Sequence, residues 1–292
     1  MTNRLQSWID GFAVWTWLPC QGTNILAHFC IHMVDVLQSD VWKTDPEWFG
    51  PWFNTEAYHI LYGHRSEREA QDLVHALHRG GHLGSAGRAL DAGCGAGRHA
   101  RSLARLGWKV EAFDLSPLSI ESARTTSKDL AGQLTFHVDD LRSLMERTSW
   151  KGAFDLTTNF FTSLGYFEGP EAQLGVVRGL AETLKPGGKL LVDFLNVHRI
   201  ANNLVPFEKL TRDGVEFVIH RRIKEGWIEK SIQFEWKGKR EHHVERVQAM
   251  TPEDLQGMMV SSGLKMLDLW GDYALSHWCN DSPRTLMLAQ RI

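Results

Sequence analysis

The segment Arg88–Ala100, RALDAGCGAGRHA, constrains the fold more than any other part of the chain. A short apolar run ends in the acid Asp91, three glycines follow at alternate positions, and a helix-forming run begins at Arg98. Strand, glycine turn and helix in this order form the first unit of a nucleotide-binding α/β sheet, because glycine lets the backbone turn tightly and approach a ligand closely. The sequence therefore predicts an α/β fold with a ligand at this turn.

The spacing of the glycines argues against a dinucleotide. Such a site needs Gly or Ala at the sixth position of G-x-G-x-x-G, where this chain has Arg98. Asp91 also suits a ligand with an ammonium group better than a diphosphate. The motif LDAGCGAG resembles motif I of the class I S-adenosylmethionine (SAM)-dependent methyltransferases. This resemblance implies that Asp91, Gly93 and Gly95 bind SAM, whereas a purely structural turn is the alternative.

Composition indicates an ordinary globular protein, and its near-neutral charge favours a small-molecule ligand, with a local basic patch for nucleic acid as the alternative. The chain has 292 residues, 43% of them hydrophobic and 23% charged, with a formal net charge of −3. No overall field therefore draws it to nucleic acid or to an anionic membrane. The four cysteines form no C-x-x-C pair, and Cys94 lies inside the glycine turn, so we expect a reducing, cytoplasmic compartment.

Residues 1–85 are expected to form a helical N-terminal cap. No Lys, Arg, Asp or Glu occurs between Gly11 and Val34, but no apolar run there reaches the ~18–20 residues of a membrane span. Nor does the start resemble a signal peptide. We expect helices at 3–18 and 24–38, and the many tryptophans before position 60 suggest a pocket wall or a homodimer contact through these helices. His28 and His32 lack a third ligand nearby, so no metal site is predicted.

A loop is expected at 43–53 and one or two helices at 54–81. The sequence EAYHILYGHR in this region resembles the segment ahead of the core in many small-molecule methyltransferases. The resemblance implies that Tyr62 or Tyr58 reaches over the bound SAM. Packing of both tyrosines in the cap is the alternative.

Residues 86–196 are expected to form the SAM-binding α/β core. A second strand at 108–116 ends in Asp114, about twenty residues beyond the glycines, where a carboxylate can accept hydrogen bonds from two ribose hydroxyls. The pattern FDLSPLSIESAR, which contains Asp114 and Leu115, resembles the second SAM-binding strand and helix of the family. After a third strand at 134–144, the resemblance implies contacts of Asp140 and of the Leu141 N–H with adenine, with Asp139 as the competing acid.

The segment 154–169, FDLTTNFFTSLGYFEG, is expected to hold the fourth strand and its exit loop. The resemblance places this strand beside the first, with residues 159–166 facing the transferred methyl group. Asn159 is then a candidate for holding the methionine end of SAM, Phe160 for walling the sulfonium, and Tyr166 for a general base. Packing and turn formation are the alternatives for each. A helix at about 170–184 and the turn KPGG lead into the fifth strand.

Residues 197–250 change to an alternating pattern with three strand-like runs, which predicts an antiparallel β insertion. In enzymes that the chain resembles, such an insertion acts as a substrate lid. His220 is a second candidate base there, although a solvated strand face is the favoured explanation. Residues 251–292 are expected to add a helix that begins after Thr251 and a closing β hairpin. The long loop of that hairpin carries His277, a third candidate base.

Taken together, the motifs predict a Rossmann-like seven-stranded methyltransferase sheet with a helical N-terminal cap and a small antiparallel β insertion. The implied activity is methyl transfer from SAM to an O, N or C acceptor on a small molecule by in-line displacement. A general base is needed only if the acceptor keeps its proton at neutral pH. The alternatives are an enzyme that uses SAM for another transfer and a non-catalytic scaffold protein.

Overall fold

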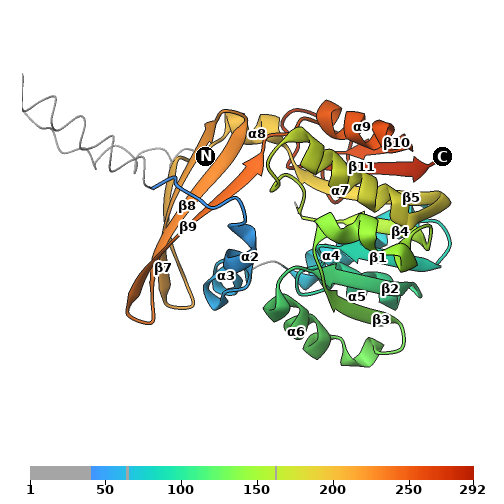
Figure 1. Cartoon of the computed structure of the whole chain (residues 1–292), viewed down its shortest axis with the longest axis horizontal. Helices are drawn as coiled ribbons and strands as arrows, with labels where there is room; N and C mark the ends of the chain where they lie inside the picture. The colour runs from blue at the N-terminus through green and yellow to red at the C-terminus, as the bar shows by residue number, and fades with distance from the viewer. Residues whose placement is uncertain (1–40, 64–65, 162) are drawn as a thin grey trace, which may run out of the picture. The chain divides into compact units, whose positions relative to one another are not determined.

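The computed structural model of the 292-residue chain describes residues 41–63, 66–161 and 163–292 (Figure 1). Its contacts divide the chain into two units, Met1–Val41 and Trp42–Ile292, and the description below concerns the second. The helices expected at 3–18 and 24–38, with His28 and His32, lie outside the described residues.

A seven-stranded sheet forms the centre of this unit, as predicted (Figure 1). Its strand order is β10-β11-β5-β4-β1-β2-β3. Strands β1 to β5 run parallel, whereas β11 is antiparallel to β5 and β10 is antiparallel to β11. The fourth strand lies beside the first, so the strand order reverses there, and ligands of such sheets bind at that point. The strands are β1 (Arg88–Ala92), β2 (Lys109–Asp114), β3 (Leu134–Val138), β4 (Phe154–Asn159), β5 (Leu184–Leu195), β10 (Leu264–Trp270) and β11 (Arg284–Arg291).

Helices cover both faces of this sheet, because the buried strands are apolar on both sides. Leu90 belongs to one apolar cluster together with residues of α7 and α9, whereas its neighbour Ala89 belongs to a second cluster with residues of α4, α5 and α6. The helices are α4 (Glu67–Arg79), α5 (Arg98–Arg105), α6 (Pro117–Thr126), α7 (Pro170–Thr183) and α9 (Pro252–Ser261), with short 3-10 turns η1 (Lys128–Leu130), η2 (Leu141–Glu146) and η3 (Thr148–Trp150). Thr251 caps α9 as expected, with a capping box to Asp254.

The insertion is a second sheet with four antiparallel strands in the order β6-β7-β8-β9. Its elements are α8 (Val197–Asn202), β6 (Phe207–Arg212), β7 (Val215–Lys224), β8 (Trp227–Trp236) and β9 (Lys239–Gln248). The three expected runs correspond to β7, β8 and β9. The count of three was too low, because β6 is an edge strand with no buried residue and thus a weak apolar pattern.

Three two-residue turns connect these four strands, and all three have the same backbone conformation. Each turn pairs a residue of positive φ with a following glycine of positive φ, as in type I′ turns. The turns are Asp213–Gly214, Glu225–Gly226 and Lys237–Gly238. Because type I′ turns match the twist of the flanking strands, they hold the hairpins in a defined register.

The expectation of a loop at 43–53 was partly wrong, because α2 (Phe49–Phe53) is helical and is followed by α3 (Glu56–Tyr62). Phe49 and Trp52 lie on one face of α2 and are both buried, which stabilises this short helix. Pro51 falls in its first turn, where a missing N–H costs little. The Trp52 ring stacks on His243 of β9 at 4.2 Å between centroids, so α2 is anchored to the insertion.

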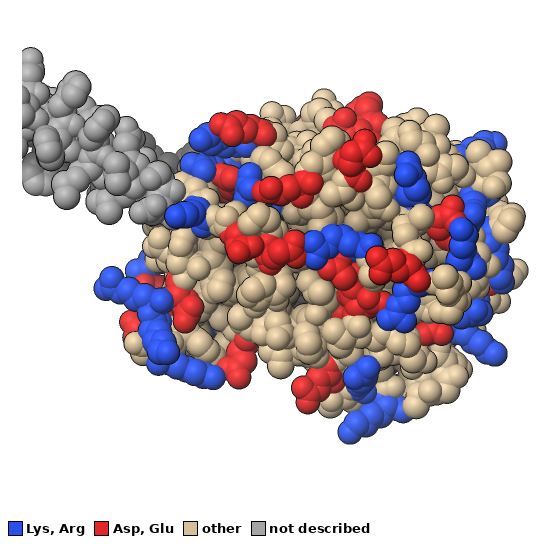
Figure 2. All heavy atoms as spheres, viewed as in Figure 1, with Lys and Arg blue, Asp and Glu red and all other residues tan. Residues whose placement is uncertain are grey.

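Basic and acidic side chains are interspersed on the face seen in Figure 2. Ion pairs among the described residues include Lys185 with Asp155 and Lys209 with Glu216. Among the described residues, no helix is long and apolar enough to cross a bilayer.

Candidate active site

The carboxyl ends of β1, β2 and β4 meet at one edge of the sheet. Asp91 of β1 is in register with Ala112 of β2 and with Thr158 of β4. The N–H groups of Gly93 and Cys94 both donate to the Phe113 carbonyl at 2.9 Å, so the glycine turn is fastened to the end of β2.

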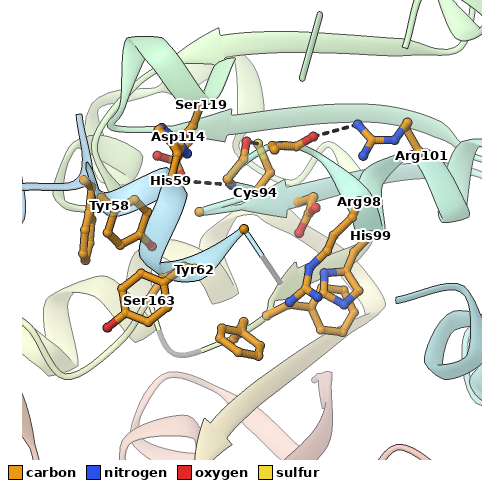
Figure 3. A pocket seen from close by; sticks show the side chains of 18 of the residues that line it. Tyr58, His59, Tyr62, Cys94, Arg98, His99, Arg101, Asp114, Ser119 and Ser163 are labelled. Carbon is orange, nitrogen blue, oxygen red and sulfur yellow. Dashed lines mark hydrogen bonds between the residues drawn. The ribbon is translucent and has the colours of Figure 1, made fainter. Parts of the chain in front are cut away.

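A cavity of about 240 Å³ opens above this edge (Figure 3). A smaller cavity of about 50 Å³ adjoins it. Residues from α2, the glycine turn, the end of β2 and the loop after β4 line both cavities: Phe53, Gly93, Asp114, Ser163 and Tyr166. The two cavities therefore form one elongated site, which we call the glycine-turn site.

Most of the predicted residues lie in this site. The first cavity is lined by Tyr62, Asp91, Gly93, Gly95, Asp114 and Tyr166, and also by Tyr58 and Phe160. The second is lined by Leu115, Asp140 and Leu141, with the competing Asp139. Five separate segments of the chain thus bring these side chains together, which is the arrangement that the resemblance implies.

Asp91 is a buried carboxyl group with one unsatisfied oxygen. Its side chain accepts a hydrogen bond from the Thr158 hydroxyl at 2.9 Å through Oδ1, whereas Oδ2 has no hydrogen-bond partner among the described residues. Burial raises the pKa of Asp91 to about 7, and the bond from Thr158 only partly opposes this. A cationic ligand group would supply the missing partner and favour the ionised form.

The glycine turn leaves room for a ligand at one position only. An added Cβ at Gly93 would lie 2.5 Å from the Ser163 hydroxyl, and one at Gly97 would lie 2.7 Å from the Phe136 ring. Gly95, at φ +54°, has no atom within 4 Å of that position, so its open side faces the cavity. Each of the three has a positive φ, which glycine adopts at little cost.

Asp114 is held in a single orientation by two backbone donors. The Ser116 N–H donates to Oδ1 at 2.9 Å and the Gly95 N–H donates to Oδ2 at 2.8 Å. Burial raises the pKa of Asp114, although these hydrogen bonds oppose the rise. Each carboxylate oxygen has a second lone pair, so the group can still accept from a vicinal diol in the cavity.

The smaller cavity is a slot between aromatic rings and an acidic turn. The rings are those of Phe49, Phe53, Tyr166 and Phe167, and Phe49 and Tyr166 stack at 6.1 Å. On the other side, Asp140 accepts hydrogen bonds from the backbone and guanidinium of Arg142. Burial would raise the pKa of Asp140, but the hydrogen bonds and charge of Arg142 outweigh it and lower the pKa. An ionised acceptor beside aromatic rings suits a planar base with an amino group.

Three predicted residues lie outside both cavities. The Asn159 amide donates to the Ala92 carbonyl at 2.8 Å and so supports the glycine turn from below. His220 lies on β7, with its ring 5.2 Å from that of Phe207. His277 is exposed in the loop before β11, and its backbone forms an isolated antiparallel β-bridge with Trp270. The structure therefore brings Tyr166, but not His220 or His277, to the glycine-turn site.

His99 is a site residue that sequence reasoning missed. It lies in the first turn of α5, lines the larger cavity and stacks on Phe160 with centroids 4.1 Å apart. Its side chain is buried, Nε2 has no hydrogen-bond partner in the described part of the chain, and burial holds the pKa well below the usual value. A histidine directly after the glycine turn was the available signal.

A buried ion pair supports the loop after β4. Asp193 of β5 is fully buried and accepts from Arg284 Nε at 2.8 Å and from the Tyr273 hydroxyl at 2.6 Å. The Phe161 N–H also donates to Asp193, at 3.2 Å. Phe161 has a φ of +61°, and the guanidinium groups of Arg98 and Arg284 lie 4.9 Å and 5.1 Å from the centroid of its ring. The surroundings thus hold a strained residue at the cavity wall.

The geometry fits SAM. The unsatisfied Asp91 oxygen suits the ammonium group of SAM, and the Asp114 carboxylate suits its ribose. The open side of Gly95 lets the ligand lie close to the backbone, and the aromatic slot suits adenine. These are the polar contacts that such a ligand requires. At Gly95, no side chain occupies the space that the ligand would fill.

Comparisons with known proteins agree with this site. Residues 89–188 match the family model described as a methyltransferase domain. The ubiquinone biosynthesis O-methyltransferase of Xanthomonas axonopodis pv. citri is 38% identical over 109 residues, which are 37% of this chain and 43% of that protein. The chain thus aligns with less than half the length of this relative.

Two solved structures share the fold. An S-adenosylmethionine-dependent methyltransferase from Clostridium acetobutylicum superposes with a TM-score of 0.67 at 18% identity, over 80% of this chain and 95% of the other. The SAM-bound amino pentose methyltransferase from Micromonospora echinaspora gives a TM-score of 0.59 at 19% identity, over 82% of this chain and 98% of the other. Residues 89–188 of the chain therefore match a methyltransferase domain, and the chain shares the fold of these two methyltransferases.

Proposed function

We propose that this protein transfers a methyl group from SAM to an O, N or C atom of a small molecule. The observation that carries the proposal is the pair of carboxyl groups, the buried Asp91 and the half-buried Asp114, at the ends of neighbouring strands around the open side of Gly95. The small-molecule acceptor is supported by the names of the relatives, which include a ubiquinone biosynthesis O-methyltransferase and an amino pentose methyltransferase.

Each residue of the site has a separate task in this proposal. Asp91 would bind the ammonium group, Asp114 the ribose hydroxyls, and Asp140 with the Leu141 N–H the adenine edge. SAM carries its methyl group on a sulfonium and is therefore already activated for transfer. The protein then contributes mainly by positioning and by excluding water, for which the aromatic wall of Phe49, Phe53 and Tyr166 is suited.

Among the three candidate bases, we propose Tyr166. It lines both cavities of the glycine-turn site, whereas His220 and His277 line neither. Its ring packs edge-on against Trp48 at 5.3 Å and Phe53 at 5.4 Å, which holds its orientation. A base is required only for an acceptor that keeps its proton at neutral pH.

Isothermal titration calorimetry with SAM tests the cofactor, and mass spectrometry of candidate acceptors after incubation tests the transfer. Saturable binding together with the gain of one methyl group on an acceptor supports the proposal. Gain of a different group from SAM would instead support another SAM-using enzyme. Binding of SAM with a co-purifying partner and no methylated acceptor would support a scaffold protein. No binding of SAM at up to millimolar concentration would reject the proposed methyl transfer.

Two further expectations stay proposals. The first is a homodimer through the helices expected at 3–18 and 24–38, and light scattering of the full chain tests for a dimer, since the protomer mass is 33.2 kDa. The second is a reducing, cytoplasmic location, supported by the free thiol of Cys94 within the cavity wall. Fractionation of cells that express the full chain tests this location.

A further inference from the structure

A separate cavity of about 490 Å³ lies between α8 and the insertion sheet. Its wall is largely apolar, formed by Ile200, Leu204, Val205, Ile228, Val247 and Pro283. Its volume falls in the range of small-molecule sites, which are concave, mostly apolar and carry a few placed polar groups. We call it the α8 cavity.

The α8 cavity lies against the loop that carries Ser163 and Tyr166. The Gln248 N–H of β9 donates to the Gly165 carbonyl at 2.7 Å. An added Cβ on Gly165 would lie 2.9 Å from Val247, which lines the α8 cavity. The end of β9 is thus packed directly on the loop after β4.

Tyr62 connects the α8 cavity with the glycine-turn site. It lines the larger cavity of that site, and its hydroxyl donates to the carboxylate of Glu245 at 2.7 Å and 2.8 Å. Lys230 donates to the same hydroxyl and lies 3.7 Å from Glu245. Glu245 and Lys230 both line the α8 cavity. One polar cluster therefore forms the boundary between the two sites.

The charged side chains of the α8 cavity already have protein partners: Arg199 donates to the Asp281 carbonyl at 2.6 Å, and the others form ion pairs. Glu208 pairs with Arg221, and Glu229 pairs with Arg222 and Arg246. Glu245 faces Lys230 and also accepts from Trp52 Nε1 at 2.7 Å. A charged ligand placed among apolar side chains needs an opposite charge of its own, so this wall favours a neutral ligand.

We propose that the α8 cavity binds a neutral, mainly apolar molecule with a hydroxyl group directed at Tyr62, Glu245 and Lys230. The polar cluster offers a carboxylate that accepts and an ammonium group that donates, and a hydroxyl group does both while remaining neutral. The apolar rim extends to the surface at Val205, which is 56% exposed and gives the apolar body a way in.

Calorimetry with three probes of one shape tests this ligand class. The probes para-butylphenol, para-butylbenzoate and para-butylbenzylamine share an apolar body and are neutral, anionic and cationic at neutral pH. We expect the phenol to bind the full chain at least about tenfold more tightly than either ion, which is the effect of one hydrogen bond to a charged group. Tighter binding of an ion, or no binding of any probe, would overturn the proposal.

Two variants place the binding in the α8 cavity. Ile200→Trp fills the cavity from α8, and Val205→Trp narrows its rim at an exposed position that does not threaten folding. Each should weaken phenol binding about tenfold or more, whereas Val260→Trp, on the exposed face of α9, should leave it unchanged. Unaltered phenol affinity in both cavity variants would locate the probe elsewhere and refute the assignment.

SAM affinity, measured in the same samples, separates this proposal from the proposed function. The cavity variants lie outside the glycine-turn site, so they should bind SAM like the unmodified chain. Failure of the unmodified chain to bind SAM would count against methyl transfer, while the probe results would still decide the ligand class of the α8 cavity.

Discussion

The Gly95 N–H donates a 2.8 Å hydrogen bond to Oδ2 of Asp114, which joins the glycine turn after β1 to the end of β2. This bond orients the carboxylate toward the cavity before any ligand arrives. Asp114→Ala should therefore weaken SAM binding by roughly 1.5–3 kcal/mol, the scale of hydrogen bonds to a charged group. Calorimetry measures the loss. Asp129→Ala, at an exposed ion pair with Arg105, is the matched control, and an equal loss in both would contradict the ribose contact.

The affinity for SAM should rise with pH around neutrality. Burial raises the pKa of Asp91 to about 7 in the free protein, and only the ionised carboxylate pairs with an ammonium group. Between about pH 6 and about pH 8 the ionised fraction increases from about one tenth to about nine tenths, so affinity should increase about tenfold. Calorimetry at several pH values checks this. In Asp91→Asn the dependence should be absent, and persistence of the full slope there would assign it to another group.

Titration of Asp91 should also make the stability of the ligand-free protein depend on pH. Because the folded-state pKa of Asp91 lies above its unfolded value, its contribution to the free energy of unfolding is fully present at low pH and is lost as pH rises through about 7. Asp91→Asn should therefore gain stability relative to the unmodified chain at high pH. Urea unfolding at a low and a high pH measures the difference, and a constant difference would show that Asp91 does not titrate in this range.

Two glycine substitutions should separate binding from folding. Both Gly95→Ala and Gly97→Ala place a side chain at positive φ, which costs roughly 1–2 kcal/mol. At Gly97 the new Cβ also overlaps the Phe136 ring, so this variant should be the less stable one in urea unfolding. At Gly95 the Cβ enters the open side of the turn, so SAM affinity should fall even where the protein is folded. If the two variants had equal stability and equal affinity for SAM, the inference that the open side of Gly95 faces the ligand would be contradicted.

Removal of Arg284 should be among the costly single changes. Asp193 is fully buried, and Arg284→Ala leaves its charge without the guanidinium, which typically costs about 3–5 kcal/mol. Urea unfolding measures the loss. Arg105→Ala, which breaks only exposed pairs, should cost about 1 kcal/mol or less. Similar losses in the two variants would mean that Asp193 finds another partner.

The central sheet could be predicted because its signals are local. The glycine turn at 93–97, the acid ending β2 and the turn before β5 each specify a strand end within a few residues, and their order specifies the topology. Two of the three type I′ turns, Glu225–Gly226 and Lys237–Gly238, separate the three runs that the sequence predicted. Most residues of the glycine-turn site follow from these positions.

The errors arose where distant contacts decide the structure. The helix α2 depends on burial of Trp52 against β9, which no local pattern near position 52 reveals. The edge strand β6 is held by backbone pairing with β7 rather than by a buried face. His220 and His277 were chosen for their chemistry, and only the register of β7 and the course of the last loop show that they lie outside the glycine-turn site.

The hydrogen bond from Trp52 to Glu245 joins residues 193 positions apart. On the ribosome, β1 to β4 can pair while the chain is still growing, because all of them are complete by Asn159. The wall that Trp52 and Tyr62 build with Glu245 must wait until the insertion has emerged. A nascent chain stalled between these points would hold the glycine turn and its carboxylates but lack the partition beside them, so limited proteolysis of such chains should cut near Trp52 and spare β1.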